Sequence, residues 1–222
     1  ELISVFPFEG VEYEKSAEKI LVTEADILKN YKGNKNGFLQ ITNFLKKKNL
    51  LPLSADNPKL PYLLKLMGYI QGDGTLTFLK SGKVLISAYG KKNDLDLIKG
   101  DIKKIGFNAL IYSRERYHEF ATNYGISKFT VTENSLQCGS IALALLLKCL
   151  GCTSGNKTKQ EFLIPEWIMD APKWMKRLYL AAFFGAELTT PKTITKHGYN
   201  FYCPVLSLNK KKEIKVNGII FL

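Results

Sequence analysis

Two acidic residues occupy the same position in two similar apolar segments, an arrangement that could bind a metal ion. The segments are LMGYIQGDG (66–74) and LAAFFGAEL (180–188). Aligning them superimposes three pairs of residues: Gly68 on Ala182, Gly72 on Ala186, and Asp73 on Glu187. If both segments are helices that pack side by side, the two carboxylates converge. Converging carboxylates repel each other and lose hydration, so a cation between them would stabilise both.

Oxygen ligands of this kind suit Mg²⁺, or Mn²⁺ in its place. We predict a metal site made of Asp73 and Glu187 together with Gly72 and Ala186, the residues directly before them. In a basic protein, such a metal site indicates hydrolysis of a phosphodiester, because bound metal activates water and stabilises the leaving oxygen.

The small residues explain how two helices would come so close. Residues four apart lie on one helix face, and glycine or alanine there lets two backbones approach. We therefore predict a helix interface at four positions: Gly68, Gly72, Ala182 and Ala186. The plainer alternatives are that Gly-Asp-Gly is only a turn, and that the twin helices merely pack in a structural protein.

The elements that would position these acids follow the order α, β, β, α, β, β, α, which then begins again. The predicted elements are a helix from Leu60 to Gly72, strands at 75–80 and 84–90, a helix at 92–106, strands at 108–117 and 126–133, and a helix at 135–151. We expect Asn93 to cap the helix at 92–106 and Gly106 to end it. A helix at 171–187 and a strand pair at 192–202 and 204–210 restart the order.

This order divides the chain into four parts. Residues 1–58 form an N-terminal flank with a small helical segment, in which Thr23 and Asp26 have capping-box spacing. The first repeat covers 59–152, a linker 153–172, and part of a second repeat 173–222. The predicted fold class is therefore α+β, with two central packed helices and a truncated second repeat.

Composition favours a polyanion as the partner. The 222 residues contain 32 Lys+Arg against 20 Asp+Glu, a net charge of +12. Nucleic acid is the natural partner for such a surplus, although a lysine-rich thermophile surface would show it too. We expect no membrane partner and a cytoplasmic location, because no apolar run spans a bilayer and no secretory signal opens the chain. Cys149 and Cys152 are interpreted as packing residues; a redox pair is the alternative.

At the two aligned segments the sequence resembles the LAGLIDADG homing endonucleases, specifically the two-repeat kind carried inside archaeal inteins. The first segment matches the signature well. The second departs from it at four positions: Ala182 replaces a glycine, Gly185 the first acid, Glu187 an aspartate and Leu188 the final glycine. FLKKKNLLPL, IYSRERY, PEWIMDAPKWMKRLYLAAFFGAEL and HGYNFYCPVLSLNK look especially like the intein endonuclease of archaeal RNA-splicing ligases. The likeness runs from about Leu60 to Asn209.

The resemblance implies saddle-shaped antiparallel sheets whose concave faces bind double-stranded DNA in the major groove. Strand alternation gives each predicted strand one polar or basic face, which suits this role. The predicted DNA-binding residues are Thr75, Thr77, Tyr112, Arg114, Arg116, Lys128, Thr130 and Thr132. Lys128 is also the candidate for the basic residue that the family places near the attacking water. A sheet face that simply meets solvent is the alternative.

Two departures from the family shape the expected activity. Residue 1 is Glu and the chain ends at Leu222, so the nucleophile and the terminal His-Asn of a splicing intein are not found there. Asp73 and Gly151 are 78 residues apart, whereas only 35 residues follow Glu187. We therefore expect no protein splicing and weak or no cleavage, with two truncated chains pairing or else a monomer. A DNA-binding module without catalysis and an RNA maturase are the rival functions.

Overall fold

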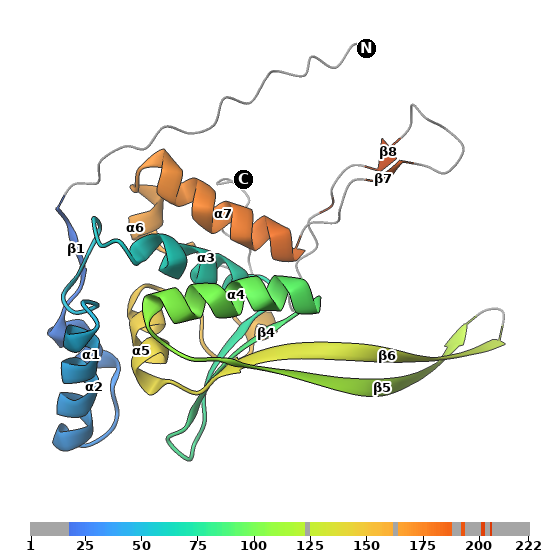
Figure 1. Ribbon diagram of the computed structural model, residues 1–222, viewed down its shortest axis with the longest axis horizontal. Helices are drawn as coiled ribbons and strands as arrows, with labels where there is room; N and C mark the ends of the chain where they lie inside the picture. The colour runs from blue at the N-terminus through green and yellow to red at the C-terminus, as the bar shows by residue number, and fades with distance from the viewer. Residues whose placement is uncertain are drawn as a thin grey trace, which may run out of the picture.

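The chain has an α+β fold in which helices cover one face of an antiparallel sheet (Figure 1). The computed structural model describes residues 18–122, 125–161, 164–187, 192–193, 201–202 and 205. The central part contains α3 (Leu60–Gln71), β3 (Thr75–Phe78), β4 (Val84–Tyr89), α4 (Lys92–Ile105), β5 (Leu110–Thr122), β6 (Gly125–Cys138) and α5 (Ile141–Cys149). This confirms the predicted order α, β, β, α, β, β, α.

The four strands form one sheet in the order β3-β4-β6-β5, and every neighbouring pair is antiparallel. Cross-strand partners lie on the same face of a sheet, so the register assigns each residue to a face. One face is packed against the helices and carries buried apolar side chains: Leu76, Ile86, Ala88, Leu136 and Cys138. We call the opposite face the free face.

The strands β5 and β6 extend as a long two-stranded arm beyond the rest of the sheet (Figure 1). Residues 112–132 of the arm are mostly exposed on both faces. Helix α4 contacts both strands of the arm, but residues 112–132 are mostly exposed on both faces, so most of the arm is accessible from both sides.

The residues before α3 form a small unit beside α5. It consists of β1 (Ile20–Val22), α1 (Glu24–Asn30), α2 (Lys35–Lys47) and β2 (Leu53–Ser54), with β1 and β2 antiparallel. The predicted capping box is present, since Thr23 and Asp26 each accept a hydrogen bond from the other's backbone N–H. Both α1 and α2 contact α5, so this segment packs on the core of the central unit.

The remaining described elements are η1 (Lys157–Lys159), α6 (Glu166–Met169), α7 (Lys173–Glu187), β7 (Lys192–Thr193) and β8 (Phe201–Tyr202). Helix α7 packs along α3, and no other pair of described helices is in such extensive contact (Figure 1). A Cβ atom added to Gly68 would lie 2.2 Å from the carbonyl oxygen of Tyr179, and one added to Gly72 would lie 2.7 Å from the Cβ of Ala186. Only glycine permits this approach.

Three local predictions were wrong. Helix α4 is capped at Lys91 without a side-chain hydrogen bond, so Asn93 is not its cap. Helix α5 begins after Ser140, which caps it through the N–H of Leu143, because residues 135–138 pair with β4 or β5 as part of β6. The described strand pair of the second half, β7 with β8, lies inside the segment 192–202 that was predicted to be a single strand.

The close contact of α3 and α7 makes a stability prediction. Gly68→Ala should lower the free energy of unfolding by about 1–3 kcal/mol, because the added methyl group meets backbone that must shift. Gly100→Ala is the matched control: nothing lies within 4 Å of its added Cβ in α4, so alanine should raise stability by about 0.5–1 kcal/mol. Urea unfolding measures both, and equal stabilisation by the two substitutions would contradict the contact.

Candidate active site

Asp73 follows directly on the end of α3, where the chain turns sharply into β3. Gly72 caps the helix and donates its N–H to the carbonyl of Gly68. A Cβ on Gly74 would lie 2.6 Å from the Cα of Ile70 and 3.0 Å from the carbonyl oxygen of Ser87. Glycine at position 74 therefore lets the chain fold back beneath the helix, and Asp73 is left at the turn.

Glu187 is the last residue of α7 and lies against the same turn. A Cβ on Gly72 would be 3.2 Å from the Cγ of Glu187. The structure thus brings the ends of α3 and α7 together, with Asp73 next in the chain to the glycine that Glu187 contacts. The four small residues of the predicted interface lie along this helix contact: Gly68, Gly72, Ala182 and Ala186.

A lysine that the sequence analysis did not identify lies at the same place. The Lys157 ammonium donates to the carbonyl oxygens of Ile70 and Gln71, each at 3.1 Å, and to that of Gly72. These carbonyls carry the partial negative charge at the C-terminal end of α3. Lys157 therefore neutralises the helix end beside Asp73.

The oxygen donors of this corner fit a hard divalent cation. Asp73 and Glu187 supply carboxylates, whereas the three carbonyl oxygens at the end of α3 already accept hydrogen bonds from the Lys157 ammonium. Among the described residues no group of three or more His, Cys, Asp or Glu side chains could hold a metal. A metal at this corner would accordingly depend on two carboxylates supplemented by backbone, water or phosphate oxygens, which is the ligand set typical of Mg²⁺.

The pKa of the Asp73 carboxyl is raised above its ordinary value. Loss of hydration near the helix ends raises it, and the Lys157 charge opposes that rise. Although Asp73 is exposed overall, surrounding protein atoms still disfavour its ionised form. A nearby cation would stabilise that form.

Lys128, predicted to lie near the attacking water, is not among the residues at the corner where α3 and α7 end. It is on the β5–β6 arm, where its ammonium lies 3.3 Å from the carboxylate of Glu119, its cross-strand partner. Lys157 is the lysine that contacts the end of α3. Its position depends on a turn and a short 3₁₀ helix 84 residues after Asp73, and no periodicity in the sequence reveals such a contact.

The predicted DNA-binding residues divide between the two faces of the sheet. Register places five of them on the free face: Thr75, Thr77, Tyr112, Arg114 and Arg116. The other three, Lys128, Thr130 and Thr132, oppose Glu119, Tyr117 and Glu115 and lie on the other face. Strand alternation predicted which residues of one strand share a face, but only the pairing of β5 with β6 relates the two strands.

A carboxylate that was not singled out organises the arginines of the free face. Glu133 Oε2 accepts hydrogen bonds from Arg114 Nε at 2.9 Å and Nη2 at 2.8 Å, while Oε1 accepts from Arg116 Nη1 at 3.3 Å. The hydrogen bond from Arg114 is the main reason that the pKa of Glu133 is lowered. Two guanidinium groups are thereby held side by side on an exposed surface.

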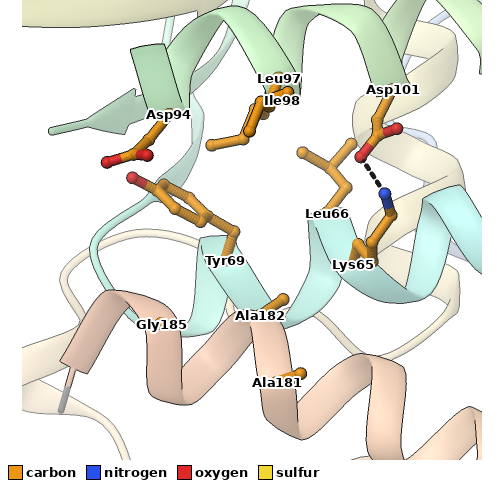
Figure 2. Close-up of a pocket in the computed structure, with 10 residues that line it drawn as sticks. All are labelled: Lys65, Leu66, Tyr69, Asp94, Leu97, Ile98, Asp101, Ala181, Ala182 and Gly185. Atoms are coloured by element: carbon orange, nitrogen blue, oxygen red, sulfur yellow. Dashed lines mark ion pairs between the residues drawn. The ribbon is translucent and has the colours of Figure 1, made fainter. Parts of the chain in front are cut away.

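A separate cavity of about 320 Å³ lies between α3, α4 and α7 (Figure 2). Leu66, Leu97 and the small residues of α7 line it, and the Lys65–Asp101 ion pair closes one end. Neither Asp73 nor Glu187 lines this cavity. It is therefore distinct from the corner where the two helix ends meet.

Comparison with known proteins finds similar segments inside much longer chains, and no protein-family model matches the sequence. The chain is 37% identical over 185 residues to the tRNA-splicing ligase RtcB of Pyrococcus furiosus, which covers 83% of this chain and 18% of that protein. It is 36% identical over 178 residues to the DNA-directed RNA polymerase subunit Rpo1N of Methanocaldococcus jannaschii, covering 79% of this chain and 13% of the subunit. The chain therefore spans less than a fifth of each of these two relatives.

Among solved structures, the homing endonuclease I-WcaI bound to its DNA recognition sequence is similar with a TM-score of 0.38. The identity is 18%, over 64% of this chain and 62% of that one. None of the described helices has the length and apolar character needed to cross a bilayer.

The contact of Lys157 with α3 predicts a pKa change at Asp73. Lys157→Gln removes the positive charge that lowers the pKa of Asp73, so this pKa should rise further. The pKa of Asp73 is already higher in the folded state than in the unfolded state, so the free energy of unfolding falls as the pH rises from the unfolded-state pKa through the folded-state pKa. This fall should be larger in the variant. Carbon NMR titration of the carboxyl measures the shift. Lys159→Gln, an exposed lysine of the same short helix, should leave it unchanged.

Proposed function

We propose that this chain is a metal-dependent DNA endonuclease of the LAGLIDADG homing type. The observation that carries the proposal is the close contact between the ends of α3 and α7, where the Cγ of Glu187 lies 3.2 Å from a Cβ placed on Gly72, the residue before Asp73. Two carboxylates at neighbouring helix ends would repel each other, and a bound cation would relieve that repulsion.

Asp73 and Glu187 would hold Mg²⁺ or Mn²⁺, with backbone oxygens near Gly72 and Ala186 completing the set. When bound, the metal would supply an activated water and stabilise the leaving oxygen of a phosphodiester. Lys157 would hold positive charge beside Asp73 and stabilise charge that develops on the phosphate. This lysine replaces Lys128 in the role first predicted for a basic residue.

The free face of the sheet would hold the DNA next to this corner. Thr75 and Thr77 begin two residues after Asp73, and Arg114 and Arg116 continue the same face along the arm. A two-stranded ribbon fits the major groove, and paired arginines suit guanine edges and phosphates. The strand β3 would therefore connect the DNA-binding face directly to Asp73.

The names of the relatives suggest that this chain corresponds to a segment inserted into different proteins, and not to the part that performs the activity of those proteins. A ligase and a polymerase subunit both contain a segment similar to this chain, and the segment makes up less than a fifth of each. A segment common to both proteins does not account for RNA ligation in one and RNA synthesis in the other. A segment found in unrelated hosts is expected of an intein that carries its own homing endonuclease.

Removing one acid should abolish metal binding and strand cleavage together. Asp73→Asn should weaken Mn²⁺ binding by at least about tenfold, because even indirect ligand partners contribute 10–100-fold. Electron paramagnetic resonance measures the binding, and Mg²⁺-dependent nicking of a plasmid carrying the uninterrupted host gene measures cleavage. DNA affinity should stay equal or rise, since a negative charge near phosphate is lost.

Asp94→Asn is the control for Asp73→Asn. Asp94 is an exposed acid of α4 that, like Asp73, lies near Tyr69. Burial and the charges of these two acids raise the pKa of Tyr69 to about 12. Loss of Mn²⁺ binding in the Asp94 variant as well, or retention in the Asp73 variant, would place the metal elsewhere. DNA binding without any Mn²⁺ binding by the unaltered chain would identify a DNA-binding module instead.

The division of the arm into two faces predicts unequal effects on DNA binding. Arg116→Gln on the free face should weaken affinity for duplex DNA by about 1–3 kcal/mol. Lys128→Gln also removes one positive charge from the arm, but on the opposite face, and should cost less than about a third of that. Fluorescence anisotropy at fixed salt measures both; a larger loss from Lys128 would show that DNA contacts the other face.

A further inference from the structure

A basic cleft of about 520 Å³ lies outside the corner of the two acids. It is enclosed by the residues that follow α1, by the turn between β3 and β4, and by α5. Four lysines line it, Lys32, Lys80, Lys83 and Lys148, and no acidic residue is among the lining residues. Three separate segments of the chain thus direct positive charge into one hollow.

The positive charge of this lysine cleft is not neutralised within the described part of the protein. None of the four ammonium groups forms an ion pair there, whereas Lys46, Lys65 and Lys128 each pair with a carboxylate. The Lys148 ammonium instead lies 5.2 Å from the centre of the Phe78 ring. Four like charges around one hollow repel one another, so an anionic ligand would stabilise them.

We infer that the lysine cleft binds the phosphate backbone of the same DNA duplex that the free face contacts, beyond the cleavage site. This inference rests on the DNA interface of the proposed function and extends it to the N-terminal segment, which supplies Lys32. The chemistry recognised is a phosphodiester backbone, independent of base sequence.

The path of β3 connects the lysine cleft to the candidate active site. The strand leaves the turn at Asp73, presents Thr75 and Thr77 on the free face, and continues to Lys80, which lines the cleft. Five residues from Thr75 to Lys80 span roughly 17 Å at about 3.3 Å per residue. That length matches about five base pairs at 3.4 Å each. A duplex along the sheet would reach the cleft about half a helical turn from the acids.

The arrangement fits an extended polyanion better than a small ion. Lys32, Lys80 and Lys83 are exposed, and the base of the cleft is apolar, with Ile141 and Leu145. A small anion is normally held by buried, converging donors, whereas exposed lysines spread along a groove follow a phosphate backbone. Phe78 shares the helix-packed face with Leu76, so the cleft lies on that side of the sheet, and the turn with Lys80 and Lys83 at the end of the edge strand β3 connects it with the free face.

The test compares two double variants with equal loss of charge. Lys80→Gln with Lys83→Gln removes two charges from the cleft. It is matched by Lys99→Gln with Lys103→Gln, which removes two exposed charges from α4, a helix that does not line the cleft. Binding to a duplex of mixed sequence is measured by anisotropy in Ca²⁺ over a range of salt. Each lost phosphate contact lowers the slope of log affinity against log salt by about 0.9, so the slope should fall by about 1.8 for the cleft variant. For the control variant it should fall by much less.

Duplex length provides a second readout. The unaltered chain and the α4 control should bind a duplex of about three helical turns more tightly than one of about one turn. The cleft variant should lose most of this gain. Equal salt slopes for the two variants, or an unchanged gain in affinity with duplex length, would overturn the inference.

The two proposals fail separately in this design. The salt slopes measure DNA binding and depend neither on Mn²⁺ binding nor on cleavage. A cleft effect in a chain that does not bind Mn²⁺ would therefore support the inference and refute the endonuclease. Metal-dependent nicking with no difference between the variants would do the reverse.

Discussion

The contact between α3 and α7 determines where everything else in the candidate site lies. Its closest point is at Gly68, where the backbone of Tyr179 occupies the space of a side chain. The hydroxyl of Tyr179 is buried without a hydrogen-bond partner among the described residues. An unpaired buried hydroxyl costs on the order of 1–3 kcal/mol, so the helix packing outweighs that cost. The close packing of the two helices thus outweighs the loss of a hydrogen bond at Tyr179, and this packing brings the ends of α3 and α7 together.

Charge in this chain is arranged by location rather than by total. Lys157 lies on the carbonyl end of α3, the arginines of the arm share Glu133, and the cleft lysines have no carboxylate partner in the described part of the chain. The net charge of +12 suggests a polyanion as the partner but does not indicate which surface of the protein binds it. Its distribution distinguishes charges that stabilise the fold from charges that remain available to a ligand.

Much of the fold follows from local patterns in the sequence. Small residues four apart, the capping box at Thr23 and the stop at Gly106 act within one or two helical turns, and each appears in the structure as expected. Contacts between distant segments could not be predicted in this way. Lys157 reaches α3 only because the connector folds back, and the face of Lys128 depends on a register fixed by thirteen cross-strand pairs.

The arm has a consequence for solubility. β5 is the outer strand of the sheet, so along 13 residues its outward backbone groups have no partner strand in the described chain. An exposed edge of this length invites pairing with another copy and aggregation. Arg114, Glu115 and Arg116 place charge on both sides of this edge and would have to be desolvated before a second strand could add. The residues suited to DNA contact thereby also keep an unprotected ribbon from self-association.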